Sequence, residues 1–391
     1  MNERASTLPK PIYLDYHATT PTDPRVASIV LRHMTEEFGN PSSIDHVFGD
    51  EAENAVFQAT KQVSQLIGSL PKEVIFTSGA TESINLVLQN SVLTGKIFKV
   101  AILPTEHKAV LDTCTVLSKK GLAEITFLKV DSRAQLDLDH LDKICSEGID
   151  LLSVMAANNE VGTIYPIQQV GEIAQQYGIP FLCDGSQAVG KIPINFEEWG
   201  ITFLAISGHK FYAPKGVGAL VIKQGQRLEP LMYGGGHQRG IRPGTLNVPG
   251  IVGLGEACRL RSLEMTEDEV RISCLRDRLQ TLLQEGIPNL VVNGDVDNRL
   301  AGNLHVSIPG IPNSAVIARV RHQLAISTGS ACSSGVEAPS HVLTAMNLSP
   351  EVIEGALRIG LGKFTTDQEV DRAAEILISA VHQILKALHS S

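Results

Sequence analysis

The sequence predicts an α/β protein with two parts: a large domain built on a mostly parallel sheet flanked by helices, and a smaller α+β domain. Between about residues 70 and 222, short apolar segments alternate with segments whose apolar residues recur every three or four positions. Beyond about residue 262, strand and helix patterns follow one another without that alternation. A chain of 391 residues is also longer than one compact core usually supports, which favours two domains.

The strands expected in the large domain are short apolar runs. They cover residues 73–78, 99–103, 124–130, 151–157, 180–184, 203–207 and 218–222. The helical patterns between them include residues 82–91, 109–120, 138–147 and 167–177. Such alternation is typical of βαβ units, whose strands run parallel. No helical pattern separates the last two strands, so we expect an antiparallel pair at one edge of the sheet.

The smaller domain follows two glycine-rich loops, at residues 234–236 and 240–244. Its elements are expected to be helices at 252–263 and 267–284 and strands at 303–308 and 356–361. Thr366 and Glu369 have the spacing of a capping box, so the last helix should begin there. The predicted boundaries are a large domain at residues 17–261 and a small domain at residues 1–16 and 262–391.

Composition excludes several functional classes. The net charge of −9 argues against a surface that binds nucleic acid directly. No apolar run approaches the roughly 18 residues that a membrane helix needs. The first residues contain Glu3 and lack the apolar core of a signal peptide, so we expect a cytoplasmic protein.

The cysteines do not predict a metal site. The six are Cys114, Cys145, Cys183, Cys258, Cys274 and Cys332. No two have C-x-x-C spacing, and no histidine stands where a zinc-finger ligand would, so the chain should have no metal site of its own. In a chain without an export signal, free thiols are expected rather than disulfides.

Three segments in the predicted sheet suggest a cofactor site. Lys210 follows a strand in the segment SGHK, where an amine freed by desolvation could form a Schiff base with a carbonyl cofactor. Asp184 ends an earlier strand, where a carboxylate could pair with the ring nitrogen of pyridoxal 5'-phosphate. Residues 79–81, in TSGATES, are small and stand between a strand and a helix, as a phosphate-binding turn requires. Each segment alone is weak evidence; their order along the chain is strong evidence.

With these segments in place, the sequence resembles the cysteine desulfurases of the NifS/IscS type. These belong to the class V aminotransferase group of fold type I pyridoxal-phosphate enzymes. The similar blocks, which span nearly the whole chain, are YLDYHATTP (13–21), FGNPSS (38–43), FTSGATES (76–83), TEHKAVLDTC (105–114), NNEVGTI (158–164), CDGSQAVGK (183–191), SGHKFYAPKGVGAL (207–220), GGGHQRGIRPGT (234–245), STGSACSS (327–334) and LRIGLGKFTT (357–366).

The resemblance implies a role for each candidate residue. Lys210 would bind the cofactor covalently, Asp184 would pair with its ring nitrogen, and Gln187 would donate to its phenolic oxygen. His107 would stack on the ring and transfer protons. The phosphate would be held by Ala80, Thr81, Ser207 and His209, with Thr245 of the other subunit of a homodimer. Asn159 and Arg358 would bind the substrate's carboxylate, for which the planar guanidinium of arginine is suited.

Cys332 differs from the other cysteines in its surroundings. Its segment, STGSACSSGVEAPS, is rich in Ser, Gly, Ala and Pro and has few apolar residues to pack. This composition predicts a mobile loop at about residues 327–340, whose thiol is exposed and able to move. The segment also resembles the long-loop type of the family, in which this cysteine is the catalytic nucleophile.

The implied activity is removal of sulfur from L-cysteine, giving L-alanine and a persulfide on Cys332. The sulfur would pass to an acceptor protein such as an iron–sulfur scaffold or a thiolation protein, and Cys332 would be an iron–sulfur ligand only transiently, together with such a scaffold. Three alternatives remain at this level: a selenocysteine lyase, another class V aminotransferase, and a scaffold or activator that binds sulfur acceptors without turnover. No membrane partner is expected.

Overall fold

A computed structural model of the chain describes residues 10–93, 96–329 and 339–388. Its centre is a seven-stranded sheet with the order β2-β8-β7-β6-β5-β3-β4. The strands are β2 (Val74–Thr77), β3 (Phe98–Ile102), β4 (Ala123–Phe127), β5 (Leu151–Ser153), β6 (Phe181–Asp184), β7 (Phe203–Ser207) and β8 (Gly218–Ile222). All seven coincide with predicted strands, and the mostly parallel α/β class is confirmed.

The expected antiparallel pair is present, but it does not form the edge of the sheet. β7 and β8 pair antiparallel, as predicted, but β8 also pairs antiparallel with β2, which forms the edge of the sheet. The prediction of an edge at β8 was therefore wrong. The sequence shows that β7 and β8 follow each other closely. It does not show the second partner of β8, because β2 lies more than 140 residues earlier in the chain.

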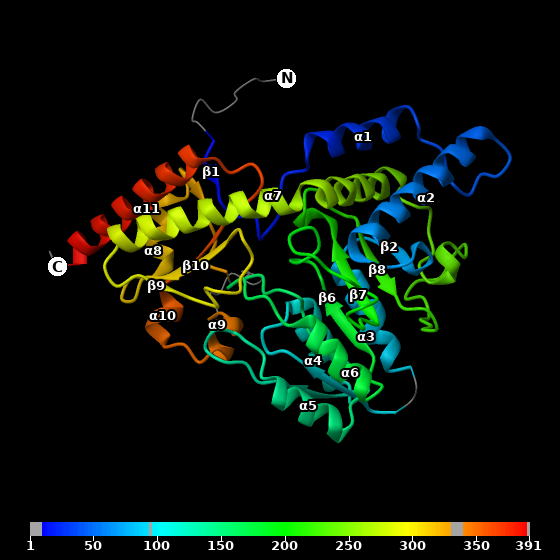
Figure 1. The fold of residues 1–391 in the computed structure, drawn as a ribbon, viewed down its shortest axis with the longest axis horizontal. Coiled ribbons are helices and arrows are strands. Elements are labelled where there is room, and N and C mark those ends of the chain that lie inside the picture. Colours follow the sequence, from blue (N-terminus) through cyan, green and yellow to red (C-terminus); the bar gives the residue numbers. More distant parts are fainter. Residues whose placement is uncertain (1–9, 94–95, 330–338, 389–391) are drawn as a thin grey trace.

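Helices cover both faces of this sheet, because successive apolar side chains of each strand point to opposite faces. Phe181 and Cys183 of β6 belong to one buried core, and Leu182 between them belongs to the other. One face packs against α3 (Ala80–Ser91) and α4 (Lys108–Lys119). The opposite face packs against α2 (Val47–Ile67), α5 (Leu138–Glu147), α6 (Ile167–Gln176) and the first half of α7 (Val248–Gly286). The helix α1 (Pro24–Thr35) lies against α7 (Figure 1).

A separate core holds the smaller α+β part of the chain. Its sheet has the order β12-β10-β9, and β1 pairs with β11 beside it. The elements are β1 (Ile12–Tyr13), β9 (Val291–Val292), β10 (Asn303–Ser307), β11 (Leu324–Ala325), β12 (Ala356–Gly360), α8 (Asn313–Val320), α9 (His341–Ala345), α10 (Pro350–Glu354) and α11 (Asp367–Leu388). The capping box is present at the start of α11: the Thr366 amide donates to Glu369 Oε2 at 2.9 Å, and the Glu369 amide donates to Thr366 Oγ1 at 3.2 Å.

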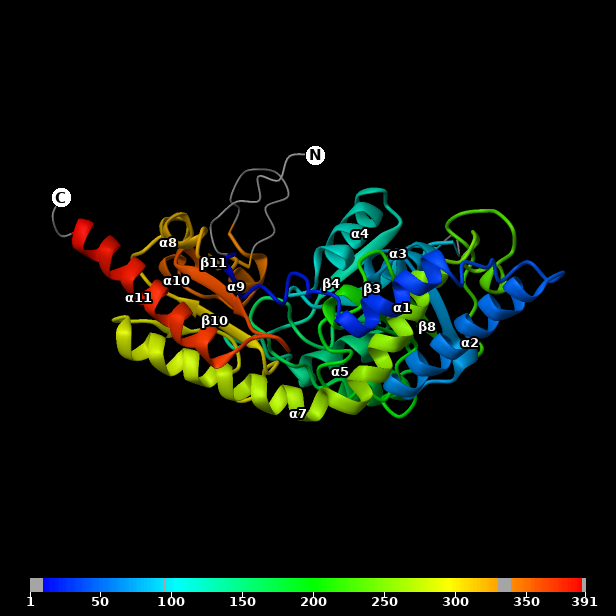
Figure 2. The ribbon, with the colours of Figure 1, turned by 90° about the horizontal axis from the view of Figure 1, so that it is seen from above.

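The long helix α7 joins the two parts, and Figure 2 shows it running beneath both of them. Two separate helices were predicted here, which was wrong. The apolar face turns from the large core, which includes Leu260, to the small core, which includes Ile272, and this turn interrupts the pattern. The helix nevertheless continues, because residues 261–271 contain neither glycine nor proline. The predicted boundary at residue 261 falls in this stretch and remains a proposal.

Candidate active site

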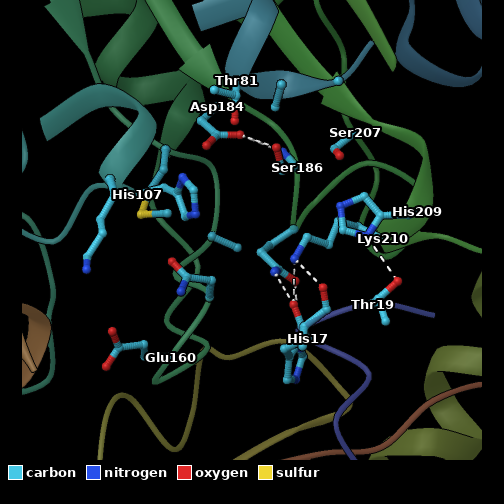
Figure 3. A pocket seen from close by; sticks show the side chains of 18 of the residues that line it. His17, Thr19, Thr81, His107, Glu160, Asp184, Ser186, Ser207, His209 and Lys210 are labelled. Atoms are coloured by element: carbon cyan, nitrogen blue, oxygen red, sulfur yellow. Dashed lines mark hydrogen bonds between the residues drawn. The ribbon is translucent and has the colours of Figure 1, made fainter. Parts of the chain in front are cut away.

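A cavity of about 1050 Å³ opens at the carboxyl ends of the central strands. Asp184 and Ser207 end β6 and β7, Ser78 follows β2, and His107 follows β3. Parallel strands bring their carboxyl ends to one edge of a sheet, so residues far apart in sequence meet there. The small domain closes the other side with Arg358 and residues 339–341. Figure 3 shows the labelled side chains converging on this space.

Lys210 stands at the end of the short helix η2 (Gly208–Lys210), directly after β7. Its Nζ donates hydrogen bonds to the backbone oxygens of His17 and Ala18, both at 2.8 Å (Figure 3). Burial, together with the positive charge of Arg358, lowers the pKa of Lys210 to about 8, although Asp184 and Asp15 oppose the shift. A large share of this amine is therefore neutral near pH 8, which is what a nucleophilic lysine requires.

Asp184 is only 4% exposed and is held by the turn that follows β6. Its Oδ1 accepts hydrogen bonds from the Ser186 amide at 2.9 Å and from Ser186 Oγ at 2.5 Å. Within the described part of the chain, both hydrogen bonds to this carboxylate use Oδ1, so Oδ2 can meet a ligand in the cavity. A fixed, buried carboxylate of this kind suits a protonated ring nitrogen.

His107 caps α4, and this contact determines which ring nitrogen of the neutral side chain carries the hydrogen. Its Nδ1 accepts a hydrogen bond from the Ala109 amide at 3.1 Å, so the neutral ring carries its hydrogen on Nε2. Burial lowers the pKa of His107, while the negative charge of Asp184 opposes that shift. His107 can therefore act as a neutral donor at Nε2.

The start of α3 has backbone amides that could hold an anion. Gly79 precedes the helix at φ 152° and ψ −178°, a conformation that favours glycine, and no side chain caps the helix. The amides of the first turn, which begins with Ala80 and Thr81, therefore remain available. Ser207 and His209 line the same part of the cavity, and the ring of His209 contacts Thr19 Oγ1 at 3.1 Å.

Arg358 lies in β12 and is 6% exposed, so its charge needs partners. Its Nη2 donates to Asp15 Oδ1 at 3.0 Å, and its Nη1 donates to the backbone oxygen of Asn159 at 3.1 Å. Its buried Nε has no hydrogen-bond partner among the described residues. The guanidinium is thus fixed at the cavity wall by two contacts and could still receive a carboxylate.

Gln187 lines the cavity beside His17 and is 3% exposed. Its Nε2 donates to the backbone oxygen of His17 at 2.9 Å, and its Oε1 accepts from Lys191 Nζ at 2.9 Å. The backbone oxygen of His17 therefore receives hydrogen bonds from both Gln187 and Lys210.

Among the described site residues, Thr245 does not line the cavity of this chain. Thr245 is exposed on its loop, and its predicted role in the other subunit stays a prediction. Cys332 lies outside the described residues. The nearest described residues on either side of it that line the cavity are Gly329 and Pro339.

Sequence reasoning missed several lining residues. Asp15, His17 and Ser186 act through contacts with Arg358, Gln187 and Asp184, which only the fold reveals. Two others connect the domains: Glu160 Oε2 accepts from Ser340 Oγ at 2.6 Å, and His341 Nε2 contacts the backbone oxygen of Glu106 at 2.9 Å. Asp15, His17, Glu160 and Ser186 do fall within the blocks that carried the family resemblance, but nothing in their spacing indicated a role.

Comparison with known proteins defines the class of this protein. Residues 12–373 match the family Aminotransferase class-V, so the chain belongs to that family. The chain is 43% identical over 378 residues to a protein named cysteine desulfurase IscS from Anaeromyxobacter dehalogenans (strain 2CP-C), covering 96% of this chain and 93% of the relative. It is 42% identical over 390 residues to a protein of the same name from Rickettsia typhi (strain ATCC VR-144 / Wilmington), covering 99% and 95%.

Solved structures give the same relationship. A NifS-like protein superimposes with a TM-score of 0.88 at 35% identity and covers 97% of this chain and 100% of that one. The structure of SspA in complex with cysteine superimposes with a TM-score of 0.79 at 31% identity, covering 92% and 100%. The predicted resemblance to NifS/IscS-type cysteine desulfurases is confirmed.

Proposed function

We propose that this chain uses pyridoxal 5'-phosphate to convert L-cysteine to L-alanine and holds the released sulfur as a persulfide on Cys332. The observation that carries the proposal is the meeting of three features in one cavity: an amine with a lowered pKa at Lys210, the buried carboxylate of Asp184, and the uncapped start of α3.

The residues present fit that cofactor. Its phosphate matches the free amides of α3, its ring nitrogen matches Asp184 Oδ2, and its aldehyde matches the amine of Lys210. When bound, pyridoxal phosphate supplies an electron sink for a substrate amino acid. The family to which the chain belongs consists of enzymes that use this cofactor, which supports the assignment.

The side chains around the cavity divide the remaining work. Arg358 would bind the substrate's carboxylate through the part of its guanidinium that is not bonded to Asp15 and Asn159. Lys210, once displaced by the substrate's amine, would remove and return the proton at the substrate's α-carbon. His107 would donate or accept a proton at Nε2.

Cys332 would take the sulfur. Its thiolate attacks the sulfur of the bound cysteine, so that an S–S bond forms as the C–S bond breaks. The electron pair of the C–S bond stays on the substrate's carbon, which takes a proton and becomes the methyl group of alanine. Support comes from Gly329 and Pro339, which line the cavity on either side of the segment that carries Cys332. The persulfide would then pass to an acceptor protein, for which an iron–sulfur scaffold and a thiolation protein are both suitable.

We further propose a homodimer. Ten exposed apolar side chains lie on α1, α2, the segment that joins them and the loop at residues 231–233. They are Leu31, Met34, Phe38, Ile44, Val47, Phe48, Phe57, Leu231, Met232 and Tyr233, and we call them the apolar end surface. Figures 1 and 2 show α1 and α2 at one end of the molecule. So much exposed apolar area is typical of a protein interface. The loop of Thr245 follows directly in the chain, which supports a site shared between subunits.

The activity can be tested with the purified protein, pyridoxal phosphate, L-cysteine and a thiol reductant that recycles the persulfide. We expect alanine and sulfide to appear in equal amounts, and Lys210→Ala to release neither above background. Alanine without sulfide would indicate a different reaction, and no turnover of cysteine with the cofactor bound would refute the proposal.

A further inference from the structure

We propose that Lys191 is a positioning residue that fixes the orientation of the Gln187 amide, so that Gln187 presents an N–H group to the cofactor. The inference rests on the proposed function, because it concerns the same cavity. Lys191 does not line that cavity. It stands four residues after Gln187, in the turn that follows β6, and reaches the site only through Gln187.

The contacts of Gln187 define the positions of its amide oxygen and amide nitrogen. The backbone oxygen of His17 can only accept, so the amide atom beside it must be the nitrogen, and the atom that meets Lys191 Nζ at 2.9 Å is the oxygen. The nitrogen then faces the opposite side and donates one hydrogen to the backbone oxygen of His17 at 2.9 Å. His17 Nδ1 lies 3.4 Å from the same amide oxygen, as a second donor would. The other hydrogen of Nε2 remains available to a ligand.

Arg261 of α7 fixes the backbone next to Lys191. Arg261, which is 1% exposed, donates from Nε to the backbone oxygen of Gly190 at 2.7 Å. Arg261 is in turn paired with Asp268 and with Glu269, the latter at 2.8 Å. The turn between Gln187 and Lys191 is also closed by its own backbone, since the Lys191 amide donates to the oxygen of Ala188 at 2.9 Å. The amine of Lys191 therefore approaches Gln187 from a defined direction.

A lysine buried at this point is costly, which argues for a function. Burial lowers the pKa of Lys191 to about 7, and the positive charges of Lys210, Arg261 and Arg358 contribute, while Glu269 opposes the shift. An apolar side chain of equal length would avoid this cost. The charged groups that shift the pKa of Lys191 lie on α7, just after β7 and on β12.

The consequence concerns the bond between Lys210 and the cofactor. A hydrogen bond from Gln187 to the cofactor's phenolic oxygen spreads the negative charge of that oxygen, which makes the neighbouring nitrogen of the linkage less basic. Without Lys191 the amide oxygen loses its contact at 2.9 Å and keeps only His17 Nδ1 at 3.4 Å, so the amide can rotate and its hydrogen bond to the cofactor weakens. The weaker hydrogen bond should then raise the pKa of the linkage, which is also influenced by Asp15, Asp184 and Arg358 around Lys210.

The test measures that pKa from the absorbance of the cofactor-loaded protein between about pH 6 and 10. We expect Lys191→Met to raise it by about one unit, since a hydrogen bond to a charged group is involved. Lys191→Arg keeps N–H donors at this position, so it should not raise that pKa. Lys120→Met, on the exposed C-cap of α4, controls for loss of a positive charge elsewhere and should not move it.

A double-mutant cycle separates positioning from a simple charge effect. If Lys191 acts through Gln187, then Lys191→Met should shift the pKa by less than half as much in a Gln187→Ala background. An equal shift in both backgrounds would overturn the positioning role while leaving the proposed function intact. Thermal unfolding of the cofactor-free variants checks that each is folded. If the unaltered protein shows no absorbance from a lysine-linked cofactor, both the proposed function and this inference fall.

Discussion

At the scale of single residues, Lys210 shows how burial can make an ordinary side chain reactive. The sequence could identify it because a lysine, an aspartate and a glycine turn follow three strands whose carboxyl ends meet. The residues that tune it could not be identified in the same way. Asp15 lies 343 positions from Arg358, and only the folded chain brings their side chains to 3.0 Å.

The lowered pKa of Lys210 leads to a prediction about pH. In the proposed function the neutral amine of Lys210 would bind the cofactor, so covalent uptake of pyridoxal phosphate by the cofactor-free protein should speed up as the pH rises, with a midpoint near 8. Arg358 contributes to the lowering, so Arg358→Met should move the midpoint upward. Stopped-flow absorbance measures both. A midpoint near 10.5, the ordinary value for lysine, would show that the amine is not perturbed.

At the scale of elements, apolar patterns predicted the strands well and the long helix poorly. β7 and β8 were predicted to the residue, because short buried runs bounded by polar residues have clear ends. The helices α1 and α2 were not predicted, because they precede the alternation of strands and helices on which the prediction rests. The two helical patterns predicted within α7 belong to one helix, whose first half packs against the large core and whose second half packs against the small core.

Close packing of α7 against α2 gives a prediction of stability. A Cβ on Gly255 would lie 2.6 Å from Ala59 Cα, a backbone atom that cannot move aside easily. We expect Gly255→Ala to lower the free energy of unfolding by about 1–3 kcal/mol, although alanine favours a helix intrinsically. Ser262→Ala, on an exposed position of the same helix, should change it by less than about 0.5 kcal/mol. Urea unfolding compares the two, and a gain in stability for Gly255→Ala would contradict this packing.

At the scale of the whole molecule, the apolar end surface predicts association of two chains. Leu31→Asp combined with Phe57→Asp should give a mass of one chain by light scattering, because two carboxylates would be buried at the interface. If Thr245 serves the other subunit, this variant should also lose pyridoxal phosphate more readily. Val270→Asp, exposed on the second half of α7 and outside that surface, should remain dimeric. A single-chain mass for the fully active unaltered protein would refute the shared site.

The central claim is that sulfur leaves L-cysteine for Cys332. The other cysteines are poor candidates: burial raises the pKa of Cys114 to about 12 and of Cys145 to about 11, and it raises those of Cys183 and Cys258 as well. Cys274 is exposed and serves as the matched control.

The most direct measurement is alanine release, together with mass-spectrometric mapping of the persulfide, in Cys332→Ala and Cys274→Ala. Both variants should keep the absorbance of the bound cofactor, since Lys210, Asp184 and the start of α3 are unchanged. We expect Cys332→Ala to lose alanine release by about a hundredfold or more, with no persulfide, and Cys274→Ala to retain both. Near-normal alanine release by Cys332→Ala, or a persulfide mapped mainly to another cysteine, would contradict the mechanism.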